Sequence, residues 1–178
     1  MAARIPWPVR PGEPEDLPFL WEMLYEAAHH RPLSDLSISR YLNGWRRPGD
    51  AAVVALDPDG GRKVGAAWYR LKPAGNPGYG FVDVSTPELA IAVVPDRRGV
   101  GVGRALLRAL LGTARSRDLK AFSLSVRRDN PAAVRLYEEN GFVRLSDLDS
   151  EFPSWVMRAK LSTVEVRPGA VQMNDTQT

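Results

Sequence analysis

The sequence predicts an α/β protein with one main domain, built on a mixed β-sheet with flanking helices. Between residues 88 and 145, three apolar strand patterns alternate with two helical patterns, an order that implies parallel strands joined by a crossover helix. Earlier in the chain, apolar stretches at 51–57 and 63–71 flank the turn sequence PDGG, which is typical of an antiparallel hairpin. The 178 residues suffice for one domain with a sizeable core.

The first half of the chain is expected to hold a leading strand, two helices and this hairpin. A helix is predicted over residues 12–30, because Pro14 suits a first turn and apolar side chains repeat at helical spacing. The apolar stripe consists of Leu17, Leu20, Trp21, Leu24 and Ala28. Ser34 or Asp35 can cap a second, short helix that continues to residues 41–45.

The second half supplies the alternating strands and helices. Strands are predicted at 88–94, 121–127, 142–145 and 154–161. The first helix opens in a glycine-rich stretch, and its apolar positions are Leu106, Leu107, Leu110 and Leu111. The second begins at Asn130-Pro131, an N-cap followed by a favoured first-turn residue, and closes on Gly141. The domain is therefore expected over 1–161, followed by a tail at 162–178 in which VEVR could add a short strand.

The composition limits the function classes. With 44% hydrophobic and 25% charged residues, the chain is typical of a globular protein. It contains no cysteine, which excludes disulfides and a thiol nucleophile. No apolar run reaches the roughly 18 residues of a membrane span, and the start shows no apolar signal region, so we expect a cytoplasmic protein.

Positive charge gathers in one segment of the chain. Residues 95–128 contain nine Lys/Arg and two Asp, a net charge of +7, which leaves −4 for the rest of a chain whose total is +3. Such an excess indicates an anionic partner near this segment. Three of these arginines fit the solvated face of an amphipathic helix instead, namely Arg108, Arg115 and Arg117.

The stretch RRGVGVGRALLRALL places glycines at positions 99, 101 and 103, directly between a predicted strand and a helix. Backbone N–H groups without a Cβ in front of them, at a positive helix end, form a cradle for phosphate. Arg98 and Arg104 flank the cradle and could add charge-assisted hydrogen bonds. The loop is not a Walker motif, which needs Lys-Ser/Thr after the last glycine, and it lacks the third small residue of the dinucleotide fingerprint.

Two motifs together resemble one known family. Arg98-Gly99-Val100-Gly101-Val102-Gly103 matches the Arg/Gln-x-x-Gly-x-Gly/Ala signature of the GCN5-related N-acetyltransferases (GNAT). Downstream, NPAAVRLYEENGFV resembles the Asn…Leu-Tyr-Glu-x-x-Gly-Phe motif of the same family. The close likeness covers residues 88–143, and the order of the other elements also fits the family's fold. The expected architecture is therefore the acyl-CoA N-acyltransferase fold, whose central mixed sheet splays between two parallel strands.

The resemblance implies acetyl-CoA as cosubstrate and no metal. The loop amides would bind the diphosphate of coenzyme A, and the pantetheine arm would lie between the splayed strands. The cofactor-binding residues it implies are Val93, Val94, Arg98, Gly99, Val100, Gly101, Val102, Gly103, Arg104 and Asn130. For Asn130 this contact is compatible with its role as a helix cap.

The resemblance also points to two residues for proton transfer. A general base is expected on the strand before the loop, where Glu88 stands at the start and shares a face with Ala90 and Ala92. The alternative is a strand-end carboxylate in water or paired with an arginine. Tyr137 occupies the tyrosine position of the second motif and would protonate or orient the leaving thiolate. Its alternative role is packing against the sheet, on the side of Val134.

The histidines do not indicate a metal site. His29 and His30 are the only ones, adjacent on a helix, and no carboxylate or cysteine cluster completes a ligand set. They are expected near the end of the first helix. In the family the acceptor binds beside the first two helices and the hairpin. Side chains that could line such a site, or equally belong to core or surface, are Trp21, Tyr25, His30, Trp45, Trp68, Tyr69 and Tyr79.

These observations predict direct acetyl transfer from acetyl-CoA to a primary amine. The acceptor stays open between small-molecule and peptide amines. The alternative is an acyl-CoA-binding sensor or regulatory protein of the same fold without catalysis. A nucleic-acid binder would use the basic segment, but no aromatic–basic interleaving supports it. We expect no nucleic-acid or membrane partner, and a homodimer would be common for such a protein.

Overall fold

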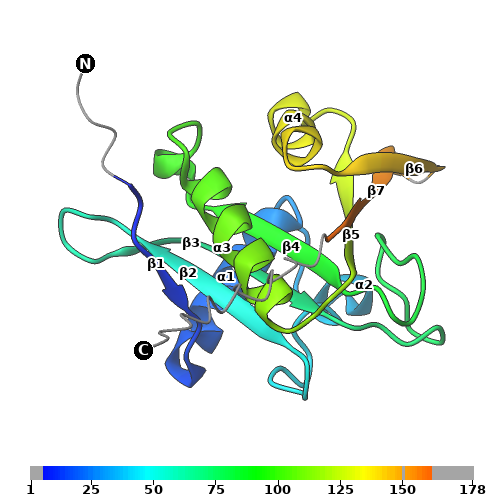
Figure 1. The fold of residues 1–178 in the computed structure, drawn as a ribbon, viewed down its shortest axis with the longest axis horizontal. Coiled ribbons are helices and arrows are strands. Elements are labelled where there is room, and N and C mark those ends of the chain that lie inside the picture. The colour runs from blue at the N-terminus through cyan, green and yellow to red at the C-terminus, as the bar shows by residue number, and fades with distance from the viewer. Residues whose placement is uncertain (1–5, 150, 162–178) are drawn as a thin grey trace, which may run out of the picture.

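A seven-stranded mixed sheet runs through the structure, and helices lie against both of its faces (Figure 1). The computed structural model describes residues 6–149 and 151–161. The strands lie side by side in the order β1-β2-β3-β4-β5-β7-β6. Their bounds are β1 Val9–Pro11, β2 Ala51–Leu56, β3 Lys63–Arg70, β4 Glu88–Val93, β5 Ala121–Arg127, β6 Val143–Leu148 and β7 Ser154–Lys160. The helices are α1 Leu17–Ala27, α2 Leu36–Ser39, α3 Val102–Ser116 and α4 Pro131–Glu139.

The sheet opens between its two parallel strands. β2 and β3 form the predicted antiparallel hairpin, and β3 pairs along β4. β4 runs parallel to β5, but the two are paired only where Glu88 lies beside Ser123. From there the strands diverge, because β5 pairs over its seven residues with β7 instead. The predicted mixed sheet with splayed parallel strands is therefore confirmed.

Each face of the sheet has its own apolar core. α3 packs on β1–β4 and, with α4, covers one face, where the predicted leucine stripe of α3 is buried (Figure 1). The other face carries α1 and α2, and α1 contributes Leu20, Met23 and Leu24 to its core. Met23 is buried although the predicted stripe did not include it. The sheet thus separates two layers, and the opening between β4 and β5 connects them.

α1 is shorter than the predicted helix over 12–30. Residues Pro14–Asp16 form a separate 3-10 turn, and Ala27 is the last residue of the α-helix. The chain leaves the helix because His29 and His30 take the left-handed conformation, with φ of 53° and 64°. Non-glycine residues adopt that region only where surrounding contacts hold them there.

α2 stops before its predicted end. Asp35 caps it as predicted, but Ser39 is its last residue. Turn-like backbone hydrogen bonds continue as far as Asn43, whose N–H donates to the Ser39 carbonyl oxygen at 2.8 Å, and the carbonyls beyond them are bound by a buried cation. The guanidinium of Arg70 donates to the carbonyl oxygens of Asn43 at 2.9 Å and Gly44 at 3.2 Å. These tertiary hydrogen bonds satisfy carbonyls that have no helical partner where the chain turns away after Asn43.

The predicted tail at 162–178, including the VEVR stretch, lies outside the described residues. Within the described part of the chain, none of the helices combines the length and the apolar character that crossing a membrane requires.

Candidate active site

The glycine loop connects the end of β4 to the start of α3. Gly99 and Gly101 have φ of 74° and 100°, and Gly101 is the left-handed N-cap residue of α3. These two positions therefore need glycine for their backbone conformation. Gly103 lies within the helix, and a Cβ there would make ordinary contact with Leu136 at 3.5 Å. A Cβ on Gly99 would have no protein atom within 4 Å, so steric crowding by the protein does not require glycine at this position.

The N-terminus of α3 is suited to hold an anion. The first helical hydrogen bond of α3 runs from the Ala105 N–H to the carbonyl oxygen of the N-cap residue Gly101, at 3.1 Å. The amides before Ala105 belong to the first turn of a 15-residue helix, which leaves such groups without helical acceptors and gives them partial positive charge. The predicted cradle is thus present in geometry, and binding of phosphate there stays a prediction.

The two arginines that flank the loop have protein partners. Arg98 donates through Nε to the Val93 carbonyl oxygen at 3.0 Å and pairs with Glu26 of α1 at 2.7 Å. Arg104 pairs with Glu139 of α4 at 2.5 Å. About half of each arginine side chain is exposed to solvent. These ion pairs join the loop to α1 and α4, and neither was predicted.

The backbone of β4 faces the opening at Val93. The Val94 N–H donates to the Val64 carbonyl oxygen of the hairpin side at 2.9 Å. Because peptide groups alternate along a strand, those of Val93 face away from β3 and toward β5. The Val93 carbonyl there accepts only from the exposed Arg98 among the described residues. Of the two predicted backbone contacts, Val93 therefore has the suitable orientation.

The two valines of the loop point in opposite directions. Val100 is exposed, whereas Val102 is buried in the core under α3. Only the backbone of Val102 can therefore reach a ligand at the loop. Trp7 holds the loop from outside, because its indole N–H donates to the Val100 carbonyl oxygen at 3.1 Å. Nothing in the sequence around Trp7 signals this contact, which joins residues 93 positions apart.

Glu88 lies in a buried hydrogen-bond network and not at a wet strand end. Its side chain is 3% exposed, and Oε1 accepts from the Tyr41 hydroxyl at 2.5 Å and from the Gly80 N–H at 2.8 Å. The Tyr41 hydroxyl in turn accepts from the Tyr79 N–H at 2.8 Å. Oε2 of Glu88 has no hydrogen-bond partner within the described structure. Burial raises the pKa of Glu88 above that of an exposed carboxyl group, although Tyr41 and Gly80 oppose this shift.

The connection between β3 and β4 closes over this carboxyl group. A Cβ on Gly78 would overlap with the Glu88 carboxylate, and one on Gly80 would overlap with the backbone of Leu124 in β5. Both glycines are therefore needed for close approach. From the sequence, NPGYG at 76–80 predicts only a break between strands. In the structure, this segment lies over the buried Glu88 side chain.

Tyr137 of α4 is buried in the core cluster on the face that carries α3. Its side chain is 8% exposed, and its ring packs against Phe142 with centroids 5.6 Å apart. The hydroxyl makes no hydrogen bond within the described structure, and burial alone raises the pKa of Tyr137 to about 12. Val134 lies in the same core cluster, so the packing role expected as an alternative is present. A role in catalysis stays a prediction.

Asn130 caps α4 as predicted. Its side-chain oxygen accepts from the Ala133 N–H at 3.2 Å, and Pro131 follows at the first helical position. This places the start of α4 directly after the end of β5. A contact between Asn130 and a cofactor is not tested by these interactions.

The histidines lie at the end of α1, on the side of the loop. His30 stacks on Tyr25 with ring centroids 4.8 Å apart and contacts Glu26 at 3.1 Å. Burial and the neighbouring cations Arg127 and Arg98 lower the pKa of His29. Over residues 6–149 and 151–161, no three His, Asp or Glu side chains gather as a metal-binding group.

The side chains proposed for the acceptor site do not all share one face. Trp68 and Tyr79 belong to the cluster under α1 and α2, the face that also carries Glu88. Tyr69 lies in the core under α3, so the alternation of β3 excludes it from an acceptor site on the Glu88 face. Of the roles left open for Tyr69, the structure therefore selects the core.

A splayed pair of parallel strands beside a glycine loop at a helix N-terminus defines a class of α/β proteins with a mixed sheet that opens at the carboxyl end of a parallel strand. The sequence profile described as the acetyltransferase (GNAT) family matches residues 16–142. This match covers more than half of the chain, and the chain belongs to that family.

Curated relatives are similar over part of their length. A mycothiol acetyltransferase of Geodermatophilus obscurus is 38% identical over 95 residues, which are 53% of this chain and 30% of that protein. A mycothiol acetyltransferase of Arthrobacter sp. is 31% identical over 142 residues, 75% of this chain and 41% of that protein. The chain thus spans less than half of these relatives.

Solved structures share the fold. A phosphinothricin acetyltransferase of Sinorhizobium meliloti, in complex with AcCoA, superposes with a TM-score of 0.70 at 21% identity, covering 97% of this chain and 98% of that one. A ribosomal-protein-alanine N-acetyltransferase of Brucella melitensis gives a TM-score of 0.66 at 25% identity, covering 86% and 99%. The predicted GNAT fold is confirmed.

Proposed function

We propose that this chain is an N-acetyltransferase that binds acetyl-CoA and transfers the acetyl group directly to a primary amine. The observation that carries the proposal is the opening between β4 and β5, with the left-handed glycines of the loop at one end and the buried Glu88 at the other. When bound, acetyl-CoA would supply the acetyl thioester within this opening.

The loop and its arginines would hold the diphosphate of the cosubstrate. The first-turn amides of α3 are directed at that position, and Arg98 and Arg104 are exposed enough to exchange a carboxylate partner for a phosphate oxygen. The Val93 peptide group would bind the pantetheine arm, since it faces β5. Asn130 would contribute at the start of α4, while it keeps its capping bond.

Glu88 would accept the proton that the amine loses. Its raised pKa makes it a stronger base than an exposed carboxylate, and its Oε2 lacks a partner within the described structure. Because the side chain is 3% exposed under Gly78, the proton would reach it through water and not by direct contact with the acceptor. Glu88→Gln should therefore remove the limb of the pH–rate profile on which activity rises as this carboxyl group ionises.

Tyr137 would orient and stabilise the departing thiolate, or protonate it. Burial keeps the phenol protonated and raises its pKa above that of an ordinary thiol, so the hydroxyl would act chiefly by donating a hydrogen bond to the thiolate as negative charge develops on sulfur. Tyr137→Phe removes only the hydroxyl, which makes no hydrogen bond within the described residues, so the fold and the acetyl-CoA dissociation constant should be preserved. We expect kcat to fall by about 10²–10⁴-fold, the usual range for general acid catalysis.

The test is release of free CoA from acetyl-CoA across a panel of primary amines, for the wild type and both variants. A kcat for Tyr137→Phe within about threefold of the wild type, less than about 1 kcal/mol of barrier, would make Tyr137 a packing residue. Acetyl-CoA binding without turnover of any amine would favour the non-catalytic sensor instead.

A further inference from the structure

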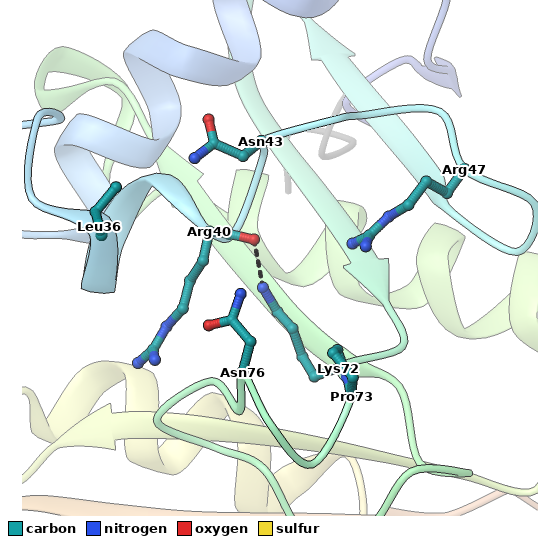
Figure 2. A pocket seen from close by; sticks show the side chains of 7 residues that line it. All are labelled: Leu36, Arg40, Asn43, Arg47, Lys72, Pro73 and Asn76. Atoms are coloured by element: carbon teal, nitrogen blue, oxygen red, sulfur yellow. Dashed lines mark hydrogen bonds between the residues drawn. The ribbon is translucent and has the colours of Figure 1, made fainter.

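A cavity of about 220 Å³ lies between the segment that follows α2 and the connection from β3 to β4. Figure 2 shows three cationic side chains around it, with Arg40 and Arg47 from the first segment and Lys72 from the second. Asn43 and Asn76 are its other polar lining residues, and no carboxylate lines it. The cavity is smaller than the roughly 300–1,000 Å³ of a site for a whole ligand, so it suits one group of a larger molecule.

Lys72 is a buried cation whose hydrogen-bonding capacity is mostly unused. Its side chain is 3% exposed, and Nζ donates to the Arg40 carbonyl oxygen at 2.5 Å. Nζ also lies 4.4 Å from the centroid of the Tyr41 ring, but it forms no ion pair within the described structure. Burial lowers the pKa of Lys72 to about 8, against the attraction of Glu88. An ammonium group has three donors, so two remain for a ligand.

Arg40 and Arg47 also lack acidic partners. Nε of Arg40 is buried without a hydrogen-bond partner, while its guanidinium lies 5.0 Å from the centroid of the Tyr79 ring. Arg47 is exposed, and neither guanidinium is ion-paired within residues 6–149 and 151–161. The nearby Arg70 shows the contrast, because it is fully buried and satisfied by Asp50 and by backbone carbonyls. Arg70 thus has a structural role, whereas each of the three cavity cations has N–H donors that form no hydrogen bond within the described structure.

The cavity adjoins the Glu88 network. Lys72 contacts the Tyr41 ring, and the Tyr41 hydroxyl donates to Glu88. A molecule with one end in the cavity would therefore lie beside the segment 78–80 that covers the proposed proton acceptor.

Resting on the proposed acetyltransferase function, we propose that this cavity binds a carboxylate or phosphate group of the acceptor, so that the enzyme selects primary amines that also carry negative charge. Three cations that form no ion pair within the described residues attract such a group through charge-assisted hydrogen bonds. The same field repels polyamines and other purely cationic acceptors, which gives discrimination in both directions.

The experiment compares matched amines that differ in the anionic group. The pairs are phosphoethanolamine with ethanolamine, and γ-aminobutyrate with butylamine, each assayed for CoA release at low ionic strength. We expect kcat/KM to be at least about tenfold higher for the anionic member, corresponding to one hydrogen bond to a charged group. Arg47→Gln and Arg40→Gln should reduce this preference about tenfold each. Arg108→Gln, an exposed arginine on α3 away from the cavity, is the matched control and should leave it unchanged.

Equal or better turnover of the neutral amines would overturn the inference and leave the acetyltransferase function intact. Activation of neutral amines by inorganic phosphate, without competition against phosphoethanolamine, would also overturn it, because the cavity would then hold an effector.

A second readout does not depend on turnover. Binding of inorganic phosphate and of phosphoethanolamine is measured by calorimetry on the wild type, Arg47→Gln and Arg108→Gln. We expect both molecules to bind the wild type, with a dissociation constant about tenfold higher for Arg47→Gln and unchanged for Arg108→Gln. If no amine is acetylated while this pattern holds, the proposed activity fails and the anion site alone remains. Absence of binding, or equal binding by Arg47→Gln, would overturn the inference.

Discussion

Glycine at position 101 is expected to serve two purposes, a left-handed backbone conformation and access for the cosubstrate. Gly101→Ala, compared with a control variant, should separate their effects. Gly101 has a φ of 100°, a region that costs an L-residue about 1–2 kcal/mol. The added Cβ would meet no protein atom closer than the Trp7 indole at 3.9 Å, so no clash contributes. We therefore expect the free energy of unfolding to fall by about 1–2 kcal/mol and Tm by about 2–8 °C.

Gly49→Ala is the matched control. Gly49 has a φ of 94°, and a Cβ there would have no neighbour within 4 Å, so the backbone cost should be nearly the same. It lies in the turn before β2, away from the loop. Both variants should lose similar stability, but only Gly101→Ala should lose affinity for acetyl-CoA. Loss of one hydrogen bond to a charged phosphate, about 1.5–3 kcal/mol, predicts roughly a 10–150-fold weaker dissociation constant.

Titration calorimetry with CoA and with pantetheine, which lacks the diphosphate, completes the design. The loss in Gly101→Ala should be seen with CoA and absent with pantetheine. Unchanged CoA affinity in Gly101→Ala would refute the assignment of the loop as the diphosphate site. An equal loss of affinity in Gly49→Ala would show that strain in the fold, and not access at the loop, lowers binding.

Two further predictions concern stability. Asp16 is buried and ion-paired with Arg10 and Lys63, each at 2.6 Å, so Asp16→Asn should lower the free energy of unfolding by about 3 kcal/mol near neutral pH, measured by urea denaturation. The hydrogen bond from Arg10 lowers the pKa of Asp16 in the folded state, so the stability difference between wild type and variant should shrink as the pH falls below about 4, the pKa of Asp16 in the unfolded chain. A difference that stays constant with pH would contradict this link between the pKa and stability. Gly78→Ala should destabilise by about 1–3 kcal/mol through overlap with the Glu88 carboxylate, and by less in a Glu88→Ala background; an equal cost in both backgrounds would place the strain elsewhere.

The elements that carry local signals could be predicted from the sequence. Apolar alternation and the PDGG turn located the hairpin, and the leucine spacing located α3. The glycine loop and the Asn130-Pro131 cap were predicted at the residues where the structure has them. All of these depend on interactions within a few residues along the chain, such as a cap bond, a permitted φ or one face of a helix. Together they sufficed for the fold and the family.

Only the tertiary structure decided what surrounds the candidate chemistry. The sequence placed Glu88 at a strand start, but its burial depends on Tyr41 and on Gly80, which approach from separate segments. Likewise, Lys72 stands in an unpatterned loop, and its role as a buried cation depends on the carbonyl of Arg40, 32 positions away. Such contacts leave no periodicity in the chain, because the two partners meet only after the sheet has brought their segments together. The sequence thus determined the glycine loop at the start of α3, and packing determined the cavity that we propose for the acceptor.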